Sequence, residues 1–365
     1  MDVFAQLPGA VSSEAGISHF GDPVREQRAL AEGDAVVPRA DRLVVSVGGP
    51  DRLTWLDSIT SQAVSRLAAG ESTELLVLDP QGRIEHAAAV LDDGETTWLI
   101  ADAPDAAGLA AWLGMMRFRS RVEVALRPEL AVIGFVRGGA AERTLVAAAS
   151  SPGGLPLVWA DPWGGVRAGG WQYAATEAHP GADYGWAEAL VAEEDVAQVA
   201  ADRPAAGLLA AEALRVAAWR PRWTGEVDER SIPHEADWLR TAVHLDKGCY
   251  RGQETVAKVH NLGHPPRRLV MLHLDGSDSV LPERGAAVFA GDAEAGRITS
   301  SARHHELGPI ALAIVSRRTP PGETLTVEAD GIRIAAAQEV IVPGDAGATA
   351  DVPRLTRLSR RPLAR

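Results

Sequence analysis

The sequence predicts a mixed α+β fold that ends in a small all-β unit. Over residues 44–136, short strand-like runs alternate with helical ones without the regular βαβ rhythm of a parallel sheet. From residue 268 onward, short strand-like runs are separated by Gly, Asp and Pro turns, which is typical of a small barrel or sandwich. The chain has 365 residues. Since a single core usually stops growing at about 250–300 residues, we expect more than one domain.

The first part of the chain predicts an antiparallel sheet with two helices. Short turns such as the Pro-Gln-Gly at residues 80–82 join the strand-like runs, and strands joined by short turns pair antiparallel. Apolar residues at helical spacing predict one helix after the Gly-Pro at 49–50 and another over 104–119. The expected strands lie at 44–47, 75–79, 83–94, 96–102 and 121–137.

Residues 137–170 are rich in Gly, Pro and small side chains and predict a loop-rich connection with one hairpin. Two helices are expected next, near 186–199 and 204–218. These changes divide the chain into an N-terminal segment, an α+β region whose two lobes meet near 137–170, the all-β unit and a disordered tail. The expected bounds are 1–40, 41–264, 265–343 and 344–365.

Composition argues against several classes of protein. The net charge of −13 disfavours a general nucleic-acid binder, because phosphates are bound by clustered Lys and Arg. A single cysteine excludes an intrachain disulfide and an all-cysteine metal cage, so a reducing cytoplasm is the expected location. The first residues do not show a basic stretch followed by an apolar one, so we expect no secretory signal. There is no run of about 18 apolar residues, so we expect no membrane partner.

Local motifs for common chemistries are missing. The chain has no GxGxxG, GxxxxGK[ST], GxSxG or HExxH. His304, His305 and Glu306 are of metal-ligating types, but adjacent side chains on a strand point to opposite faces. We therefore expect an exposed polar turn there and no metal site.

The only cysteine, Cys249, lies between Lys247 and Arg251 in the segment KGCYRGQE. If this segment is extended, the side chains of these three residues lie on one side. Residues 253–259 have helical character, which places the thiol just before a helix N-terminus. Cations and a helix N-terminus both favour the thiolate. The pattern leaves two interpretations open: a reactive cysteine, or a small buried residue whose neighbouring cations serve other partners.

The whole segment KGCYRGQE, residues 247–254, resembles the K-G-C-Y-x-G-Q-E signature of the YgfZ family of folate-binding proteins, and every fixed position is present. Residues 214–238 are similar to a segment that this family shares with the glycine-cleavage T-protein, an aminomethyltransferase. Residues 49–64 and 78–90 resemble the N-terminal part of that superfamily, and residues 296–315 resemble its C-terminal barrel. The likeness spans about residues 44–315.

The resemblance implies a T-protein-like fold of three lobes, with a C-terminal β-barrel, around a central channel that holds tetrahydrofolate or another reduced folate. It also implies a role in the assembly or maintenance of iron–sulfur clusters, including those of enzymes that modify tRNA. The implied partners are iron–sulfur client or assembly proteins. Because Cys249 alone cannot hold a cluster, such a role needs further ligands from a partner, a second protomer or a small thiol.

The site residues follow from this resemblance and from residue chemistry. We expect Lys247 and Arg251 to tune Cys249. The residues expected near the folate are Arg215, Arg222, Trp223, Glu235, Tyr250, Gln253 and Glu254.

Alternatives stay open for several of them. Arg215 could face the channel or solvent. The arginines and tryptophans at 219–223 could stack on a flat ring and pair with an anion, or anchor a loop with solvated arginines. Glu235 could support its own turn or contact a ligand, and Tyr250 could belong to the core. Residues 253–254 could cap and orient the cysteine loop.

Two positions depart from the transferase pattern. The acidic pair that places a carboxylate near the reacting nitrogen of the folate is replaced by His86 and Ala87, and the glutamate that grips the pterin is replaced by Ala217. Losing the pterin's carboxylate partner costs about 1–3 kcal/mol unless another group compensates.

A folate-dependent aminomethyl or methyl transferase is therefore the rival function, and an interaction module without a ligand is a third. The acids available to replace the missing carboxylate are Asp79, Glu85 and Asp92.

Overall fold

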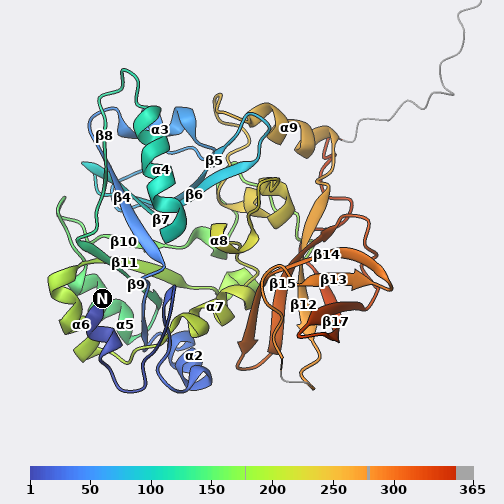
Figure 1. Ribbon diagram of the computed structural model, residues 1–365. Coiled ribbons are helices and arrows are strands. Elements are labelled where there is room, and N and C mark those ends of the chain that lie inside the picture. Colours follow the sequence, from blue (N-terminus) through green and yellow to red (C-terminus); the bar gives the residue numbers. More distant parts are fainter. Residues whose placement is uncertain (177, 278–279, 351–365) are drawn as a thin grey trace, which may run out of the picture.

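The computed structural model describes residues 1–350 except 177 and 278–279, and they form three lobes (Figure 1). The first lobe contains an antiparallel sheet of order β5-β6-β7-β4-β8. Helices α3 and α4 cover one face, and Leu56, Leu99 and Leu109 lie in the core between them and the sheet. The elements are β4 (Arg42–Gly48), α3 (Arg52–Ile59), β5 (Ser72–Leu78), β6 (Ile84–Asp92), β7 (Thr96–Asp102), α4 (Ala103–Met115) and β8 (Glu123–Leu126).

The second lobe contains a sheet of order β10-β11-β9-β3. Helices α1, α5 and α6 cover its outer face, where Phe4, Leu145 and Val199 pack against Phe135 of β9. A hairpin of β1 and β2 and helix α2 precede the sheet in the chain. The elements are α1 (Asp2–Ala5), β1 (Val11–Ser13), β2 (Gly16–His19), α2 (Pro23–Ala31), β3 (Val36–Pro38), β9 (Leu130–Val136), α5 (Ala140–Ala148), β10 (Val158–Ala160), β11 (Trp186–Ala192), η3 (Glu193–Asp195) and α6 (Val196–Asp202).

Two expectations for this lobe are wrong. Residues 186–192 form strand β11 and not a helix, because β11 lies between β10 and β9 and is buried on both faces. A strand buried on both faces lacks the alternation that identifies half-buried strands. Residues 137–170, expected as a loop-rich connection, contain helix α5.

The inner faces of the two sheets pack against each other. Val44 and Trp98 of the first sheet share one core with Val132 and Trp186 of the second. The first sheet is therefore covered by helices on one face and by the second sheet on the other.

The third lobe is a closed six-stranded barrel of order β12-β15-β14-β13-β16-β17, which confirms the predicted C-terminal barrel. Its interior is filled by apolar side chains such as Val270, Val288 and Val315. The strands are β12 (Arg267–Leu274), β13 (Ala287–Ala290), β14 (Ala293–His304), β15 (Gly308–Ser316), β16 (Leu325–Ala329) and β17 (Ile332–Val340).

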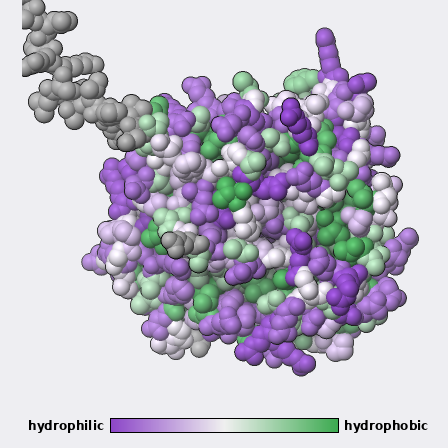
Figure 2. Space-filling model, turned by 180° about the vertical axis from the view of Figure 1, so that it is seen from behind, coloured by the Kyte–Doolittle hydropathy of each residue, from purple (hydrophilic) through white to green (hydrophobic). Residues whose placement is uncertain are grey.

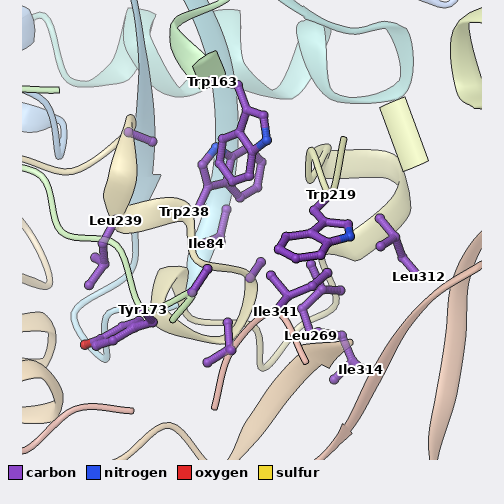
Figure 3. Close-up of a cluster of buried hydrophobic side chains, with 14 of the residues drawn as sticks. Ile84, Trp163, Tyr173, Trp219, Trp238, Leu239, Leu269, Leu312, Ile314 and Ile341 are labelled. Atoms are coloured by element: carbon purple, nitrogen blue, oxygen red, sulfur yellow. The ribbon is translucent and has the colours of Figure 1, made fainter. Parts of the chain in front are cut away.

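A core at the junction of the lobes joins the barrel to the rest of the molecule (Figure 3). Leu269 and Leu312 from the outside of the barrel pack with Trp219, Trp238 and other side chains of the connecting segments. These segments contain η1 (Pro162–Gly164), η2 (Pro180–Asp183), α7 (Leu208–Ala217), α8 (Trp223–Glu226), η4 (Pro233–Ala236), η5 (Trp238–Arg240) and α9 (Gln253–Leu262).

Residues 344–350, which the sequence assigns to a disordered tail, pack against α9. The backbone N–H of Thr349 donates to the carbonyl of His260, and that of Ala350 donates to the carbonyl of Asn261. The remainder of the expected tail, 351–365, lies outside the described residues. No helix in the described part of the chain is long and apolar enough to span a bilayer. On the face shown in Figure 2, hydrophobic side chains lie in separate small groups among hydrophilic ones.

Candidate functional site

A small cavity lies between the two sheets and the α7–α8 segment. Its volume is about 60 Å³, and its wall carries Ala87 of β6 with five aromatic side chains and five arginines. A second compartment of about 240 Å³ adjoins it and shares four wall residues with it. The aromatic residues are Trp159, Tyr184, Trp186, Trp223 and Trp238, and the shared residues are Arg39, Tyr184, Arg215 and Arg222.

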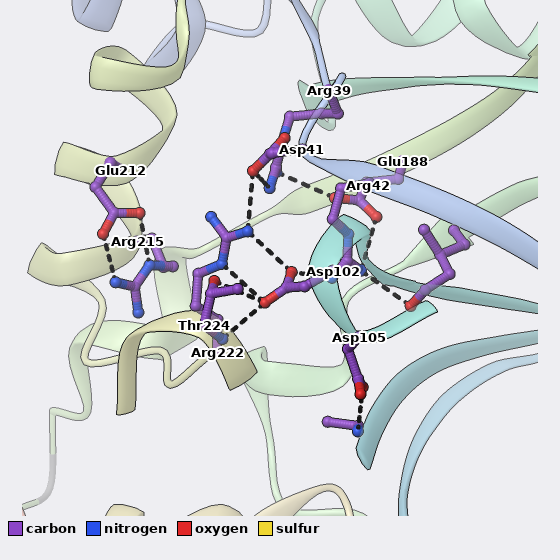
Figure 4. Close-up of polar contacts among 12 residues, drawn as sticks. Arg39, Asp41, Arg42, Asp102, Asp105, Glu188, Glu212, Arg215, Arg222 and Thr224 are labelled. Atoms are coloured by element: carbon purple, nitrogen blue, oxygen red, sulfur yellow. Dashed lines mark hydrogen bonds and ion pairs between the residues drawn. The ribbon is translucent and has the colours of Figure 1, made fainter. Parts of the chain in front are cut away.

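Buried ion pairs surround the cavity (Figure 4). Arg222 Nη2 lies 2.9 Å from both Asp41 and Asp102, and Arg42 bridges Asp102 and Glu188. Although burial disfavours its charge, Arg39 and the neighbouring arginines lower the pKa of Asp41 to about 2. Each of these guanidinium groups is therefore already paired with carboxylates of the protein.

Asp102 is the shared acceptor of this network. It is 1% exposed and accepts from Arg42, Arg222 and both the backbone N–H and the hydroxyl of Thr224. Burial opposes its ionisation, but Arg222 and Arg42 outweigh burial and hold its pKa far below the usual range. Its contacts join β7, β4 and α8.

Arg215, expected near the folate, borders both compartments and is 6% exposed. Its guanidinium binds Glu212, Glu226 and the hydroxyl of Ser300 on the barrel strand β14. The side chain is thus buried and not solvent-facing, and it links α7 to α8 and the barrel.

Trp223 and Glu235 occupy different environments. Trp223 lines the cavity, and its Nε1–H donates to the carbonyl of Glu85 at 3.0 Å. Glu235 is not among the cavity-lining residues. Its carboxylate accepts from Arg267 at 2.8 Å and from the backbone N–H of Ile232 in its own turn.

The signature loop, defined here as residues 247–252, bends at Lys247 and Gly248 and turns at Arg251 and Gly252, and it forms no β-strand, so the expected strand geometry is wrong. Lys247 Nζ donates to the backbone carbonyls of Asp57, Thr60 and Gln62 at the end of α3. Burial lowers the pKa of Lys247 to about 8, so the ammonium is charged at neutral pH and its three N–H donors match three acceptors.

The other cation of the loop is also paired. Arg251 Nη1 lies 2.5 Å from Glu85. Cys249 is exposed, and within the described residues no hydrogen bond joins its thiol to Lys247 or Arg251. The two cations therefore hold the loop in place. The sequence predicts that they lie beside the thiol, and these contacts do not show that placement.

Two glycines allow this loop to pack on the β5–β6 turn. Gly252 has φ of 84°, and a Cβ there would lie 2.6 Å from the carbonyl oxygen of Asp79. Gly82 has φ of 76°, and a Cβ there would lie 3.0 Å from Thr255 of α9. Only glycine satisfies both the left-handed conformation and the close approach.

The remaining signature residues lie around the loop. Tyr250 is buried in the core at the junction of the lobes, and Lys247 Nζ lies 5.3 Å from its ring centroid. The side chain of Gln253 donates to the carbonyl of Lys247 at 3.2 Å, and Glu254 is exposed in the first turn of α9. As predicted, a helix begins at Gln253, and α9 continues to Leu262.

The acids that could replace a transferase carboxylate are all engaged away from the cavity wall. Asp79 accepts from backbone N–H groups of its own turn, Glu85 binds Arg251, and Asp92 binds Arg52. His86 binds Asp105 of α4 at 2.5 Å and is likewise not part of the cavity wall.

Sequence reasoning missed much of the cavity wall. Arg39 and Arg42 lie close together in the chain, but Tyr184 comes from a distant segment, so no local motif joins all three. One signal was present: Arg39, Asp41 and Arg42 stand together at the start of β4, where the chain becomes fully buried. Charged residues at the edge of a buried strand are usually paired in the folded protein.

The comparisons with known proteins agree on the fold. Residues 267–341 match the glycine cleavage T-protein C-terminal barrel domain. The chain is similar over 91% of its length to 94% of the glycine cleavage system aminomethyltransferase T of Bartonella henselae, with a TM-score of 0.71 and 17% identity. At this identity the likeness shows the fold, and the chain has the T-protein-like fold that the sequence predicts.

A curated relative covers a smaller part. A proposed chloroplastic transferase of Arabidopsis thaliana is 30% identical over 126 residues, which is 34% of this chain and 28% of that protein. The match thus spans little more than a quarter of the relative.

We predict that Asp102→Asn lowers the free energy of unfolding at neutral pH by about 3–5 kcal/mol, because it leaves two buried guanidinium groups short of a charge. The stability that the ionised Asp102 provides is present above its unfolded pKa of about 3.9 and is lost as the pH falls toward its depressed folded pKa. Urea unfolding at several pH values measures both effects. Asp51→Asn, which removes the carboxylate partner of the exposed Arg121, is the control and should change stability little. Equal midpoints for both variants would contradict the role of Asp102.

We predict that Lys247→Met destabilises the protein by about 1–3 kcal/mol and loosens the signature loop, because three carbonyls lose their donor. Thermal unfolding measures the first effect, and hydrogen–deuterium exchange of residues 245–252 measures the second. Lys258→Met, an exposed position on α9, is the matched control. Unchanged exchange in the Lys247 variant would show that the ammonium does not hold the loop.

Proposed function

We propose that this protein is a YgfZ-like folate-binding protein that supports iron–sulfur cluster assembly or maintenance through Cys249. The observation that carries the proposal is the signature loop. Its glycines, Lys247 and Arg251 fasten it to the first lobe, while its cysteine is exposed. A thiol at the surface of a fixed loop is accessible to another protein.

The central cavity is compatible with a reduced folate in residue type. Tyr184 and Trp186 stack with 7° between their planes, and a flat ring packs well against such surfaces. Arg220 Nη1 is buried without a hydrogen-bond partner, which leaves one donor for an acceptor in the cavity. The volume of the second compartment, about 240 Å³, is close to the lower end of the volumes of small-molecule pockets, about 300–1,000 Å³. When bound there, a folate would supply a one-carbon carrier.

The cluster is cargo in this proposal, because one thiol cannot enclose it. Within residues 1–350 apart from 177 and 278–279, no group of three His, Cys, Asp or Glu side chains is arranged to hold a metal ion. The other ligands would come from a client or assembly protein, a second protomer or a small thiol. Enzymes that modify tRNA are among the clients that the family resemblance suggests.

Transferase chemistry has less support. Ala87 lines the cavity where a carboxylate is required, Ala217 stands where the pterin-binding glutamate belongs, and the nearby acids have other partners.

We expect tetrahydrofolate binding and the cellular role to depend on different residues. We predict that Tyr184→Leu weakens tetrahydrofolate binding about 3–10-fold, the loss of one ring contact, while Cys249→Ser leaves it unchanged. Isothermal titration calorimetry measures both affinities. In cells that depend on the protein, Cys249→Ser should lower iron–sulfur enzyme activity. The proposal fails if wild type does not bind tetrahydrofolate, or if Cys249→Ser supports those enzymes as wild type does.

An aminomethyl-transfer assay distinguishes the proposed function from the rival transferase function. With 5,10-methylenetetrahydrofolate, ammonia and a lipoyl carrier protein, we expect no aminomethyl transfer above background, because no carboxylate is available at Ala87 or Ala217. Mass spectrometry of the carrier gives the measurement, and a bona fide T-protein is the positive control. Transfer at the rate of that control would establish the transferase and overturn our ranking.

A further inference from the structure

A separate pocket, distinct from the central cavity and its adjoining compartment, lies next to the signature loop. Its volume is about 390 Å³, and it shares no wall residue with the central cavity. Two of its wall residues directly precede Lys247, and three come from α9, which follows the loop. The wall consists of Gly169, Gly170, Trp171, Leu245, Asp246, Ala257, His260 and Asn261.

The loop that carries Trp171 is fixed in place. The backbone N–H of Trp171 donates to the carbonyl of Leu239, and that of Leu245 donates to the carbonyl of Gly169. Two residues further along, the N–H of Tyr173 donates to the buried carboxylate of Asp237 at 2.6 Å. Trp171 is nevertheless 43% exposed. The exposed indole therefore belongs to a loop that backbone hydrogen bonds hold in place.

His260, one of the wall residues, is hydrogen-bonded to a tyrosine that fixes its tautomer. The hydroxyl of Tyr173 lies 2.9 Å from His260 Nδ1, and Figure 3 shows this hydroxyl pointing away from Trp219 and Trp238. Burial raises the pKa of Tyr173 and lowers that of His260, so the phenol keeps its proton and donates it to a neutral imidazole. The imidazole N–H is then on Nε2, and its ring meets Trp171 edge to face at 5.1 Å.

The charges of the wall are suited to a cation. Asp246 supplies a carboxylate, Trp171 an indole, and none of the eight wall residues is Lys or Arg. Two lysines adjoin wall residues in the sequence: Lys247 directs its ammonium to the carbonyls of Thr60 and Gln62, and Lys258 is an exposed residue of α9. An aromatic face with a carboxylate is the combination that binds guanidinium groups by cation–π contact and charge-assisted hydrogen bonds.

The chain carries such groups directly after two residues that are hydrogen-bonded to wall residues of this pocket. The backbone N–H groups of Thr349 and Ala350 donate to the carbonyls of His260 and Asn261, both of which are wall residues. Residues 351–365 contain five arginines and one aspartate, a net charge of +4. Since the whole chain has a net charge of −13, the preceding 350 residues carry −17. Arg354 follows Ala350 by four residues, a reach of up to about 13–14 Å.

We propose that this pocket binds a guanidinium group and that its occupant is an arginine of residues 351–365 of the same chain. The inference is independent of folate binding, because the two sites share no residue. Occupation of the pocket would place a basic segment beside the signature loop, where it competes with any partner that contacts this face.

The test uses the full chain labelled with 5-fluorotryptophan and observed by ¹⁹F NMR, with the Trp171 signal assigned by its loss in Trp171→Phe. Replacing the five arginines of residues 351–365 by Gln should shift that signal, and Asp246→Asn should shift it in the same direction. Adding a synthetic peptide of residues 351–365 to the five-Gln variant should restore it. Asp246→Asn in that variant should weaken the peptide about tenfold or more, the loss of one charge-assisted contact. Arg121→Gln, an exposed arginine with its own partner, is the control and should change nothing.

Three outcomes would overturn the proposal. One is an identical Trp171 signal in wild type and the five-Gln variant, together with no effect of the peptide. Another is a wild-type signal that shifts on dilution, which would assign the occupant to a second copy of the chain. The third is binding of free arginine to wild type as tight as to the five-Gln variant, which would show that the pocket is open in the full chain.

Discussion

The carboxylate of Asp102 is the group on which the arrangement of the first two lobes and α8 depends. It joins Arg42 of its own sheet to Arg222 and Thr224 of the α8 segment, and Arg42 continues to Glu188 in the second sheet. Removing these charges from water is costly, and the cost is offset only because every group finds several partners. Such a network contributes little net stability, but it tolerates few alternative arrangements, so it fixes how the two sheets and α8 meet.

The same pairing determines what the cavity offers a ligand. The three arginines at 39, 42 and 222 are balanced by Asp41, Asp102 and Glu188. An anionic ligand therefore meets no excess of positive charge in this part of the wall and would have to compete with carboxylates that are already bound. Aromatic contact is left as the main source of affinity, together with the unpaired donor of Arg220. This balance favours recognition of a flat ring over recognition of a carboxylate tail.

The parts of the fold that the sequence predicts correctly are those with local signals. Turn residues at short spacing identify the barrel, and Gly252 and Gly263 bracket α9. The sequence of residues 186–192 predicts a helix, because burial of the strand on both faces removes the alternation of polar and apolar residues. Its buried Glu188 is stable only beside Arg39 and Arg42, some 150 residues away. The partners of Lys247 could not be predicted either, because they are backbone carbonyls at the end of α3. Contacts of this kind depend on tertiary structure and leave no pattern in the sequence.

A bulge in β6 connects the cysteine loop to the strand that carries Ala87. Between the pairs Val77–His86 and Leu78–Ile84, β6 contains one extra residue, Glu85, so the strand bulges there. A bulge redirects a side chain, and here it accompanies the contact of Glu85 with Arg251, while Ala87 remains on the cavity wall. Glu85 thus holds the cysteine loop through Arg251. Because one carboxylate cannot bind Arg251 and face the cavity at once, anchoring the loop keeps the acid two residues before Ala87 away from the cavity wall.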